Sequence, residues 1–417
     1  MCDKVTVKIE LKRKKLILLT SEFPYGKGET FLETEIAFLA SGFDEVLIYS
    51  SAASTETKRD LPDNVCSTVF SNRLSKWDKL KALTGFFSNE FRSEKKRVRE
   101  VYKQEWSRGI RNTALISLFI GKRWKQELEK EIERSKGIDL TFYSYWCTDT
   151  ALGLALLSQS NPSVKTLSRV HGWDLYFEAT SFNYQPYREL IAHNLTCLYP
   201  ISRKGECYIR DRWKVNPNAL RMARLGTREV NEVQPNRIRN ILVSCSNLIP
   251  LKRVSLIAES LKYVDQVDLE WYHFGDGPRR AKIDKLVEMS RREGVKIHLM
   301  GRKSNDEILR WFEENAPNLF INVSTTEGIP VSIMEAMSFG TPVFATDVGG
   351  TSEIVSNENG RLLKPDITPA ELGRMIQEFF LLNREDGLVM RSNAREMWRK
   401  RYNASVNYKQ FVEEILE

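Results

Sequence analysis

The amino-acid sequence predicts an α/β protein built from two doubly wound domains with parallel sheets. The chain has 417 residues, more than one ordinary hydrophobic core supports. Short apolar runs alternate with helical patterns, as in parallel sheets covered by helices. This alternation weakens into Asn-, Pro- and Arg-rich sequence around residues 216–234 and then restarts. We therefore expect an N-terminal domain at residues 1–225, a C-terminal domain at 226–400, and a final helix at 401–417 that could return to the N-terminal domain.

In the N-terminal half, the apolar runs that we expect to be strands cover residues 15–20, 45–50, 139–145, 165–170 and 196–199. A helix over residues 30–40 follows the first strand through a loop that contains Gly26 and Gly28. His171 and Asp174 come directly after the strand at 165–170. Ligands of open α/β sheets bind at the carboxyl ends of strands, so both places are candidates for a binding site.

The C-terminal half begins with a linker over residues 226–236. Its predicted strands lie near residues 239–245, 268–274, 295–300, 318–323 and 342–345. Its predicted helices lie near residues 252–263, 278–292, 304–315, 330–339 and 351–355, and further helices follow from Pro369.

Composition excludes several classes of protein. An apolar content of 41% and a mean hydropathy of −0.40 describe a globular protein, and no run of 18 apolar residues could form a membrane-spanning helix. Residues 1–15 are charged and lack the apolar stretch of a signal peptide, so we expect a cytoplasmic protein. The 6 cysteines and 4 histidines show no metal-ligand spacing, which predicts reduced thiols and no metal site.

The net charge of +8 is concentrated in one segment. Between Arg92 and Lys136 there are 14 Lys or Arg against 7 Glu, an excess of 7. The segment from Phe86 to Lys136 also carries bulky apolar residues, so it could lie on an anionic membrane surface. The alternative is a pair of ordinary amphipathic helices with solvated charged faces. No nucleic-acid-binding motif accompanies the charge, so we expect no nucleic-acid partner.

Two glutamates, Glu327 and Glu335, stand 8 positions apart across a predicted strand-to-helix junction. Pro330 suits the first turn of the helix, and Gly340 ends it. Glu327 therefore lies at the carboxyl end of a strand and the positive end of a helix, where backbone N–H groups bind anions and polyols. Glu335, about two turns further on, can reach the same ligand.

This Glu-x7-Glu arrangement is followed by Gly340-Thr341-Pro342-Val343 and Val348-Gly349-Gly350. Together these motifs resemble the donor site of family 4 retaining glycosyltransferases, which belong to the glycosyl transferases group 1 and have the GT-B fold. The resemblance is most specific over residues 239–364. It implies two Rossmann-like domains that face an interdomain cleft, with a nucleotide-sugar donor as substrate. By resemblance, Glu327 binds the sugar hydroxyls, Glu335 binds the ribose, and the sugar and diphosphate are held by Gly328, Ile329, Pro330 and Val331.

The same resemblance assigns roles to the loop after the 239–245 strand. The family carries an arginine and, five residues later, a lysine that neutralise the diphosphate. Lys252 matches the lysine, but Asn247 replaces the arginine and Arg253 replaces the glycine that usually follows the lysine. Either Arg253 supplies the second positive charge, or this site neutralises the diphosphate with one cation fewer.

Other positions match the family less specifically. Gly275 and Gly277 match a turn that lets the backbone approach the nucleotide, and Gly301 and Arg302 lie where relatives contact the base. His171 matches a histidine that contacts the donor sugar across the cleft, and Asp174 could orient it or bind the acceptor. The loop with Gly26 and Gly28 matches a glycine-rich loop near the phosphates and the acceptor.

These matches predict a hexosyltransferase-type enzyme in which the catalytic residues are Glu327, His171 and Lys252. We expect transfer, with retention of configuration, to a saccharide or lipid-linked saccharide in cell-surface polysaccharide synthesis, at the inner face of the plasma membrane. The Asp-x-Asp triplet of metal-dependent sugar transferases does not occur, so no metal or other cofactor is expected.

Two rival functions remain at this stage. An epimerase or phosphorylase of the same fold is disfavoured because its hallmarks are not apparent. A non-catalytic subunit that binds a sugar nucleotide or acts as a scaffold is favoured by the lost arginine at Asn247. Release of nucleoside diphosphate separates an enzyme from such a subunit.

Overall fold

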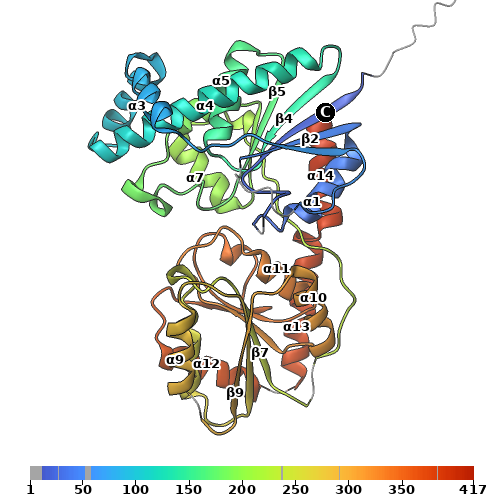
Figure 1. The fold of residues 1–417 in the computed structure, drawn as a ribbon. Coiled ribbons are helices and arrows are strands. Elements are labelled where there is room, and N and C mark those ends of the chain that lie inside the picture. The colour runs from blue at the N-terminus through green and yellow to red at the C-terminus, as the bar shows by residue number, and fades with distance from the viewer. Residues whose placement is uncertain (1–11, 27, 52–57, 236–237, 291, 383) are drawn as a thin grey trace, which may run out of the picture.

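The computed structural model describes residues 12–26, 28–51, 58–235, 238–290, 292–382 and 384–417. Two parallel six-stranded sheets lie in two α/β units, one above the other in Figure 1. Their strand orders are β3-β2-β1-β4-β5-β6 and β12-β11-β10-β7-β8-β9. In each sheet the order reverses near the middle, which is the mark of a doubly wound sheet. The predicted fold class is therefore confirmed.

The N-terminal sheet is built around β1, whose residues Leu16, Ile17 and Leu18 are completely buried. Its strands are β1 (Lys14–Thr20), β2 (Glu45–Ser50), β3 (Val65–Val69), β4 (Asp139–Ser144), β5 (Lys165–Val170) and β6 (Cys197–Pro200). Its α-helices are α1 (Leu32–Gly42), α2 (Lys76–Ala82), α3 (Asn89–Glu100), α4 (Arg108–Arg134), α5 (Asp149–Ser160), α6 (Arg188–Asn194) and α7 (Arg203–Trp213). Short 3-10 helices are η1 (Leu83–Phe87), η2 (Phe177–Ala179), η3 (Ser181–Asn183) and η4 (Pro217–Ala219).

The C-terminal sheet has short, buried central strands, as expected when helices cover both faces. Its strands are β7 (Ile241–Cys245), β8 (Leu269–Phe274), β9 (Val295–Gly301), β10 (Leu319–Asn322), β11 (Val343–Thr346) and β12 (Gly360–Leu363). Its α-helices are α8 (Val254–Ser260), α9 (Arg280–Met289), α10 (Asn305–Asn315), α11 (Val331–Ser338), α12 (Pro369–Leu381) and α13 (Arg384–Arg401). The remaining 3-10 helices are η5 (Pro250–Lys252), η6 (Leu261–Tyr263) and η7 (Thr351–Glu353).

Some elements differ from the sequence-based expectation. The strands β3 and β12 were not predicted, because each is short and only partly buried. The single helix expected over residues 252–263 is divided into η5, α8 and η6, and Arg253, which is left-handed with φ of 46°, separates η5 from α8. The helix expected over residues 351–355 is one 3-10 turn, η7.

The chain crosses between the two units twice, and the crossings are tied together. Thr227 and Asn403 form a parallel bridge, and the Trp398 indole N–H donates to Thr227 Oγ1 at 2.8 Å. Beyond the second crossing, α14 (Ala404–Leu416) packs against α1 on the N-terminal unit, next to it in Figure 1. Its Phe411 ring lies under the guanidinium of the fully buried Arg169, 4.4 Å from the ring centroid. The C-terminal helix thus completes the core of the N-terminal unit.

Candidate active site

Glu327 lies in the loop between β10 and α11, and Lys252 ends η5 in the segment after β7. The Lys252 Nζ and Glu327 Oε1 atoms are 2.5 Å apart, and Asn322 Nδ2 donates to the same oxygen at 3.3 Å. The Glu327 side chain is only 11% exposed. Because β7 and β10 are neighbours in the sheet, residues far apart in the sequence meet at one edge. The two residues with the strongest sequence-based assignments therefore form an ion pair.

The backbone around Glu327 is held by the glycines that follow β11. Gly349 has φ of 53°, and a Cβ there would lie 1.7 Å from Glu327 O. The Gly350 N–H donates to Gly328 O at 2.7 Å. Any side chain at Gly349 would therefore displace the loop. No side chain caps α11 at Pro330, so the N-terminal end of this helix keeps its positive character beside the loop.

Glu335 lies further along α11 and hydrogen-bonds with α10, through a 2.6 Å bond donated by Asn305 Nδ2. It faces a narrow gap where α11, the interdomain linker and the segment before α1 meet, with Thr30, Phe31 and Arg228 among the lining residues. Burial raises the pKa of the Glu335 carboxyl to about 7. This carboxyl group therefore changes charge near neutral pH, unlike an ordinary surface glutamate.

Arg253 and Asn247 occupy the positions where the sequence departs from the family pattern. The Arg253 Nε donates to Val323 O and its Nη1 to Pro365 O, each at 2.6 Å. Burial lowers the pKa of Arg253. Asn247 is exposed in the loop after β7. Arg253 thus hydrogen-bonds backbone carbonyl groups, whereas Lys252 forms the ion pair with Glu327.

The two glycines after β8 lie too close to the loop after β7 to carry a side chain. Gly275 has φ of 140°, and a Cβ there would lie 1.9 Å from Ser246 O. A Cβ at Gly277 would lie 2.8 Å from Leu248 O. The loops after β7 and β8 are therefore in close contact. Gly301 has open space around it, and Arg302 is exposed, so this end of β9 is accessible.

On the N-terminal unit, His171 follows β5 and is held by Asp174. Asp174 Oδ1 accepts the His171 backbone N–H, and Oδ2 accepts that of Cys147, both at 2.9 Å. The same Oδ2 lies 3.6 Å from His171 Nδ1. Burial would raise the pKa of Asp174, but the His171 and Cys147 hydrogen bonds outweigh it and hold this pKa below its usual value. Asp174 is completely buried, so its surroundings suit orientation of His171 rather than contact with an acceptor.

His171 itself is buried and neutral. Burial lowers the pKa of its imidazole, more than the neighbouring Asp174 raises it. Its side chain is 8% exposed, and its Nε2 has no hydrogen-bond partner among the residues that the structure describes. A buried polar atom without a partner is costly, and a ligand hydroxyl would satisfy it.

The two units touch where these residues lie. A Cβ at Gly172 would lie 3.1 Å from the Gly328 backbone nitrogen, and one at Gly328 would lie 3.4 Å from His171 O. The backbone after β5 is therefore in van der Waals contact with the backbone that carries Glu327. The structure brings Glu327, Lys252 and His171 to one place between the two units.

The loop with Gly26 and Gly28 is fixed by residues that the sequence did not reveal. Glu29 accepts the backbone N–H groups of Ser21, Glu22 and Phe23 at 3.0, 2.6 and 2.6 Å. Arg59 Nη2 donates to Gly26 O and Gly28 O at 3.1 and 2.5 Å. An acidic residue before a helix was the only sequence signal, and it suggests a cap rather than a loop anchor.

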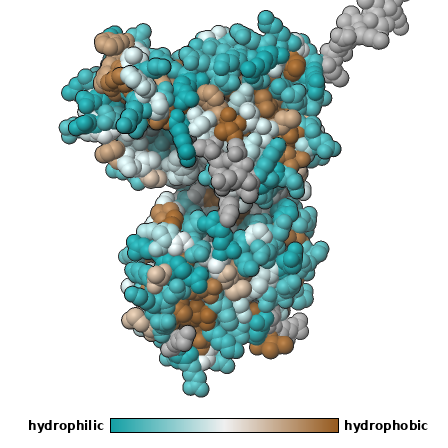
Figure 2. Space-filling model, in the orientation of Figure 1, coloured by the Kyte–Doolittle hydropathy of each residue, from teal (hydrophilic) through white to brown (hydrophobic). Residues whose placement is uncertain are grey.

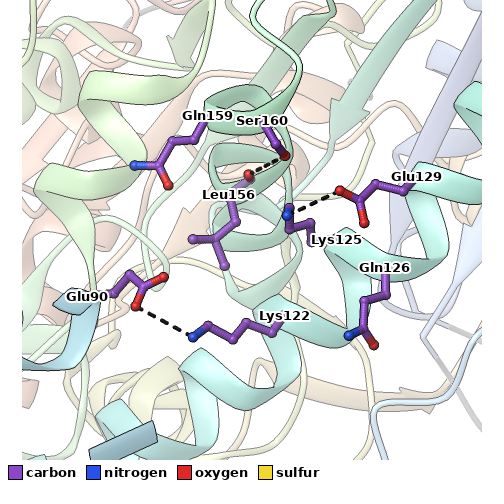
Figure 3. Close-up of a pocket in the computed structure, with 8 residues that line it drawn as sticks. All are labelled: Glu90, Lys122, Lys125, Gln126, Glu129, Leu156, Gln159 and Ser160. Carbon is purple, nitrogen blue, oxygen red and sulfur yellow. Dashed lines mark hydrogen bonds and ion pairs between the residues drawn. The ribbon is translucent and has the colours of Figure 1, made fainter. Parts of the chain in front are cut away.

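A pocket of about 430 Å³ lies elsewhere, against α3, α4 and α5 (Figure 3). Its charged side chains pair with each other: Lys122 lies 3.5 Å from Glu90, and Lys125 lies 3.2 Å from Glu129. Because these charges pair with each other, little charge remains to attract a ligand. The pocket is therefore a weaker candidate for a ligand-binding site than the interdomain site. In the described part of the chain no three Cys, His, Asp or Glu cluster as metal ligands, and no helix has the length and apolarity to cross a membrane.

Comparison with known proteins finds a family match in the C-terminal unit. Residues 227–397 match the family model Glycosyl transferases group 1, which includes Lys252, Glu327 and Glu335. The chain is 27% identical to an uncharacterized glycosyltransferase of Methanocaldococcus jannaschii, over 62% of this chain and 70% of that protein. It is 26% identical to the amylovoran biosynthesis glycosyltransferase AmsK of Erwinia amylovora, over 44% of this chain and 45% of AmsK.

Among solved structures, Anabaena HepE in complex with UDP and glucose matches with a TM-score of 0.65 and 17% identity. The alignment covers 96% of this chain and 98% of HepE. At this identity the likeness establishes the fold of the whole chain. The protein therefore has the GT-B fold, and its residues 227–397 match the family model Glycosyl transferases group 1.

Proposed function

We propose that this protein is a retaining glycosyltransferase of family 4 and hexosyltransferase type, using a nucleotide-sugar donor. Its acceptor is a saccharide or lipid-linked saccharide in cell-surface polysaccharide synthesis. One observation carries the proposal: the Glu327–Lys252 ion pair lies directly across the domain boundary from His171. The group 1 domain and the similarity to a glycosyltransferase of amylovoran biosynthesis support it.

In this proposal each part of the donor is bound by different residues of the protein. Lys252 and the N-terminal end of α11 neutralise the diphosphate, so that no metal ion is required. Glu335 accepts hydrogen bonds from the ribose, and the base lies near Gly301 and Arg302. Donor binding redirects Lys252 from Glu327 to a phosphate, which frees Glu327 to accept sugar hydroxyls.

The reaction breaks the bond between the sugar C1 and the diphosphate oxygen, and the bonding electrons leave with the diphosphate. The acceptor oxygen bonds to C1 from the same face, and its proton passes to the leaving phosphate. Positive charge on the sugar ring is stabilised by the Glu327 carboxylate, and the negative charge on the diphosphate by Lys252. Neutral His171 hydrogen-bonds a sugar hydroxyl through Nε2.

The test is a panel of UDP-, GDP- and ADP-sugars assayed for protein-dependent release of nucleoside diphosphate, with and without a mixed lipid extract. We expect release from one donor, abolished in Glu327→Ala and retained in Glu288→Ala, which removes an exposed glutamate of the same unit. Saturable nucleotide binding without release from any donor would instead support a non-catalytic sugar-nucleotide-binding subunit. Two observations favour this second candidate. Asn247 stands where the family has an arginine, and the Arg253 guanidinium is hydrogen-bonded to the backbone.

We also propose that the protein works in the cytoplasm, peripherally bound to an anionic membrane. We propose a different contact surface from the one that the sequence suggested. Within the segment from Phe86 to Lys136, bulky residues such as Phe91 and Trp124 are buried in the core of the N-terminal unit. Exposed apolar side chains instead gather on α2 and η1, which together we call the α2–η1 patch: Trp77, Leu80, Leu83 and Phe87, exposed by 74, 56, 46 and 79%.

Three exposed lysines, Lys76, Lys79 and Lys81, are interleaved with this patch. Figure 2 shows apolar surface at the end of the N-terminal unit that carries α3. Exposed aromatic residues among lysines suit the headgroup region of an anionic bilayer. Sedimentation with phosphatidylglycerol vesicles at low salt should carry the protein down, and a Trp77→Ala/Phe87→Ala variant should stay in the supernatant. Wild-type protein that remains in the supernatant would end this part of the proposal.

A further inference from the structure

A row of three rings leads from solvent to the interdomain site. Trp146 follows β4, and His171 and Trp173 follow β5, so all three stand at the carboxyl edge of the N-terminal sheet. The ring centroids of His171 and Trp146 are 4.3 Å apart, and those of Trp146 and Trp173 are 5.3 Å apart. Exposure rises along the row: His171 is 6% exposed, Trp146 is intermediate, and Trp173 is 51% exposed.

Hydrogen bonds to Glu29 and Gln185 hold this row of rings. The Trp146 indole N–H donates to Glu29 Oε1, the carboxyl group that also anchors the loop before α1. The Trp173 carbonyl accepts a 2.7 Å hydrogen bond from Gln185 Nε2. Side chains that are fixed before a ligand arrives lose little conformational entropy on binding. The Trp146 ring and the Trp173 backbone are therefore held in place before a ligand arrives.

The inner end of the row coincides with the proposed reaction site. His171 and Gly172 contact the Glu327-Gly328 backbone, and the buried His171 Nε2 has no hydrogen-bond partner among the described residues. The outer end is the half-exposed Trp173. Packing does not require a large apolar ring to be exposed in this way, whereas a ligand that approaches Glu327 along the row would cover it.

We infer that Trp146 and Trp173 form an acceptor subsite that stacks against the ring of a saccharide. The inference rests on the proposed function, and it narrows the acceptor to a molecule with a sugar ring beside the reacting hydroxyl. A pyranose presents C–H groups on its faces and hydroxyls at its rim. The C–H groups suit the negative face of an indole ring. The inner end of the row, at His171, places the reacting hydroxyl of such a saccharide beside the donor sugar that His171 contacts in the proposed function.

Saturation-transfer NMR on the full chain tests the subsite without any turnover. The probes are methyl glucosides and galactosides, maltotriose, and octyl β-glucoside, each with UDP present. We expect saturation of ring C–H protons in at least one probe. Trp173→Ala should reduce this signal at least fivefold, and Trp173→Phe should retain about half of it.

Phe182→Ala is the matched control, because Phe182 lies on the same long loop after β5 and is 57% exposed. This variant should leave the saturation signal unchanged. A signal that survives Trp173→Ala, or that falls equally in Phe182→Ala, overturns the subsite. So does the absence of transfer to any probe, or transfer confined to the alkyl protons of octyl glucoside, which would indicate a lipid-binding surface.

Failure of the subsite can be told from failure of the proposed function. If ring saturation depends on Trp173 but no donor releases diphosphate, the subsite stands and the enzyme activity fails. If a donor turns over, Trp173→Ala should raise the KM for a saccharide acceptor about tenfold with a smaller change in kcat. An acceptor KM unchanged in Trp173→Ala would overturn the subsite while leaving the transferase activity intact.

Discussion

The two loops that meet at the domain boundary are held in different ways. In the C-terminal unit, Glu327 is engaged by the ammonium group of Lys252, so two charged side chains hold each other. In the N-terminal unit, the carboxylates of Asp174 and Glu29 accept backbone N–H groups and are enclosed by the protein. Lys252 and Glu327 can each replace the other by a ligand group. The carboxylates of Asp174 and Glu29 already accept backbone N–H groups of their loops.

This difference predicts what each face offers to a ligand. The C-terminal face presents a cation and a carboxylate, which suit a charged diphosphate and an electron-deficient sugar ring. The N-terminal face presents a neutral imidazole and aromatic rings, which suit an uncharged saccharide. Under the proposed function, this asymmetry would let the C-terminal face stabilise the charges of the donor while the N-terminal face recognises the shape of the sugar rings.

The largest expected effect tests the charge pair of the C-terminal face. Glu327→Ala and Lys252→Ala should each lower the rate of diphosphate release about 100-fold or more, because each removes charge stabilisation from the transition state. The double variant should be little slower than the slower single variant, since residues that act as a unit are not additive. Losses that multiply in the double variant would show that the two side chains act independently.

The next effect tests whether the N-terminal carboxylates act through the backbone. Glu29→Gln leaves one amide oxygen for three backbone N–H groups, so we expect a loss of about 1–3 kcal/mol in the free energy of unfolding. The acceptor-dependent rate should also fall, because the loop and Trp146 lose their anchor. Urea unfolding and product formation measure the two effects. Glu133→Gln is the control, since Glu133 is an exposed glutamate on α4 of the same unit.

A third prediction concerns the pH dependence of donor binding. Burial raises the pKa of Glu335 to about 7, so this group is mostly charged at pH 8 and mostly protonated at pH 6. A charged carboxylate accepts ribose hydroxyls better, and nucleoside diphosphate affinity should therefore fall about tenfold from pH 8 to pH 6. Isothermal titration calorimetry measures the affinity, and Glu335→Gln should lose most of this pH dependence, leaving the part that comes from titration of the terminal phosphate of the ligand. A wild-type affinity that rises toward pH 6 would contradict the assignment.

The smallest effect is expected at Arg253. Its guanidinium bonds the backbone at Val323 and Pro365, so Arg253→Lys should cost about 1 kcal/mol of stability and change donor affinity less than threefold. Lys252→Arg, the matched change at the neighbouring residue, should affect turnover more. A tenfold or larger loss of donor affinity in Arg253→Lys would mean that Arg253 supplies the second positive charge after all.

The sequence predicted the C-terminal face better than the N-terminal face, for a physical reason. Glu327 follows an apolar run that indicates a buried strand, and Lys252 was assigned by its match to a family motif. Both loops follow neighbouring strands, whose carboxyl ends lie at one edge of the sheet. The central strands were predicted to within a few residues from such apolar runs. The edge strands β3 and β12 were missed, because a partly exposed strand lacks a continuous apolar run.

The N-terminal anchors depend on contacts between distant residues. Trp146 bonds Glu29 across 117 positions, and Arg59 reaches Gly28 across 31 positions, and neither spacing follows from a local pattern. The same limit applies to the α2–η1 patch. Trp77 and Trp124 are equally apolar in the sequence, and only the packed structure shows that Trp124 is buried and Trp77 is not.

The return of α14 to the N-terminal unit has a consequence for synthesis of the chain on the ribosome. Its Tyr408, Phe411 and Ile415 are buried, and α1, its packing partner, is translated more than 350 residues earlier. The N-terminal unit therefore cannot close its core as it emerges, and the aromatic cover over Arg169 stays missing until α14 leaves the exit tunnel. Domains usually fold as they are translated, first unit first. Here the first unit to be made is completed last, so the nascent protein exposes this apolar surface through the whole translation of its C-terminal unit.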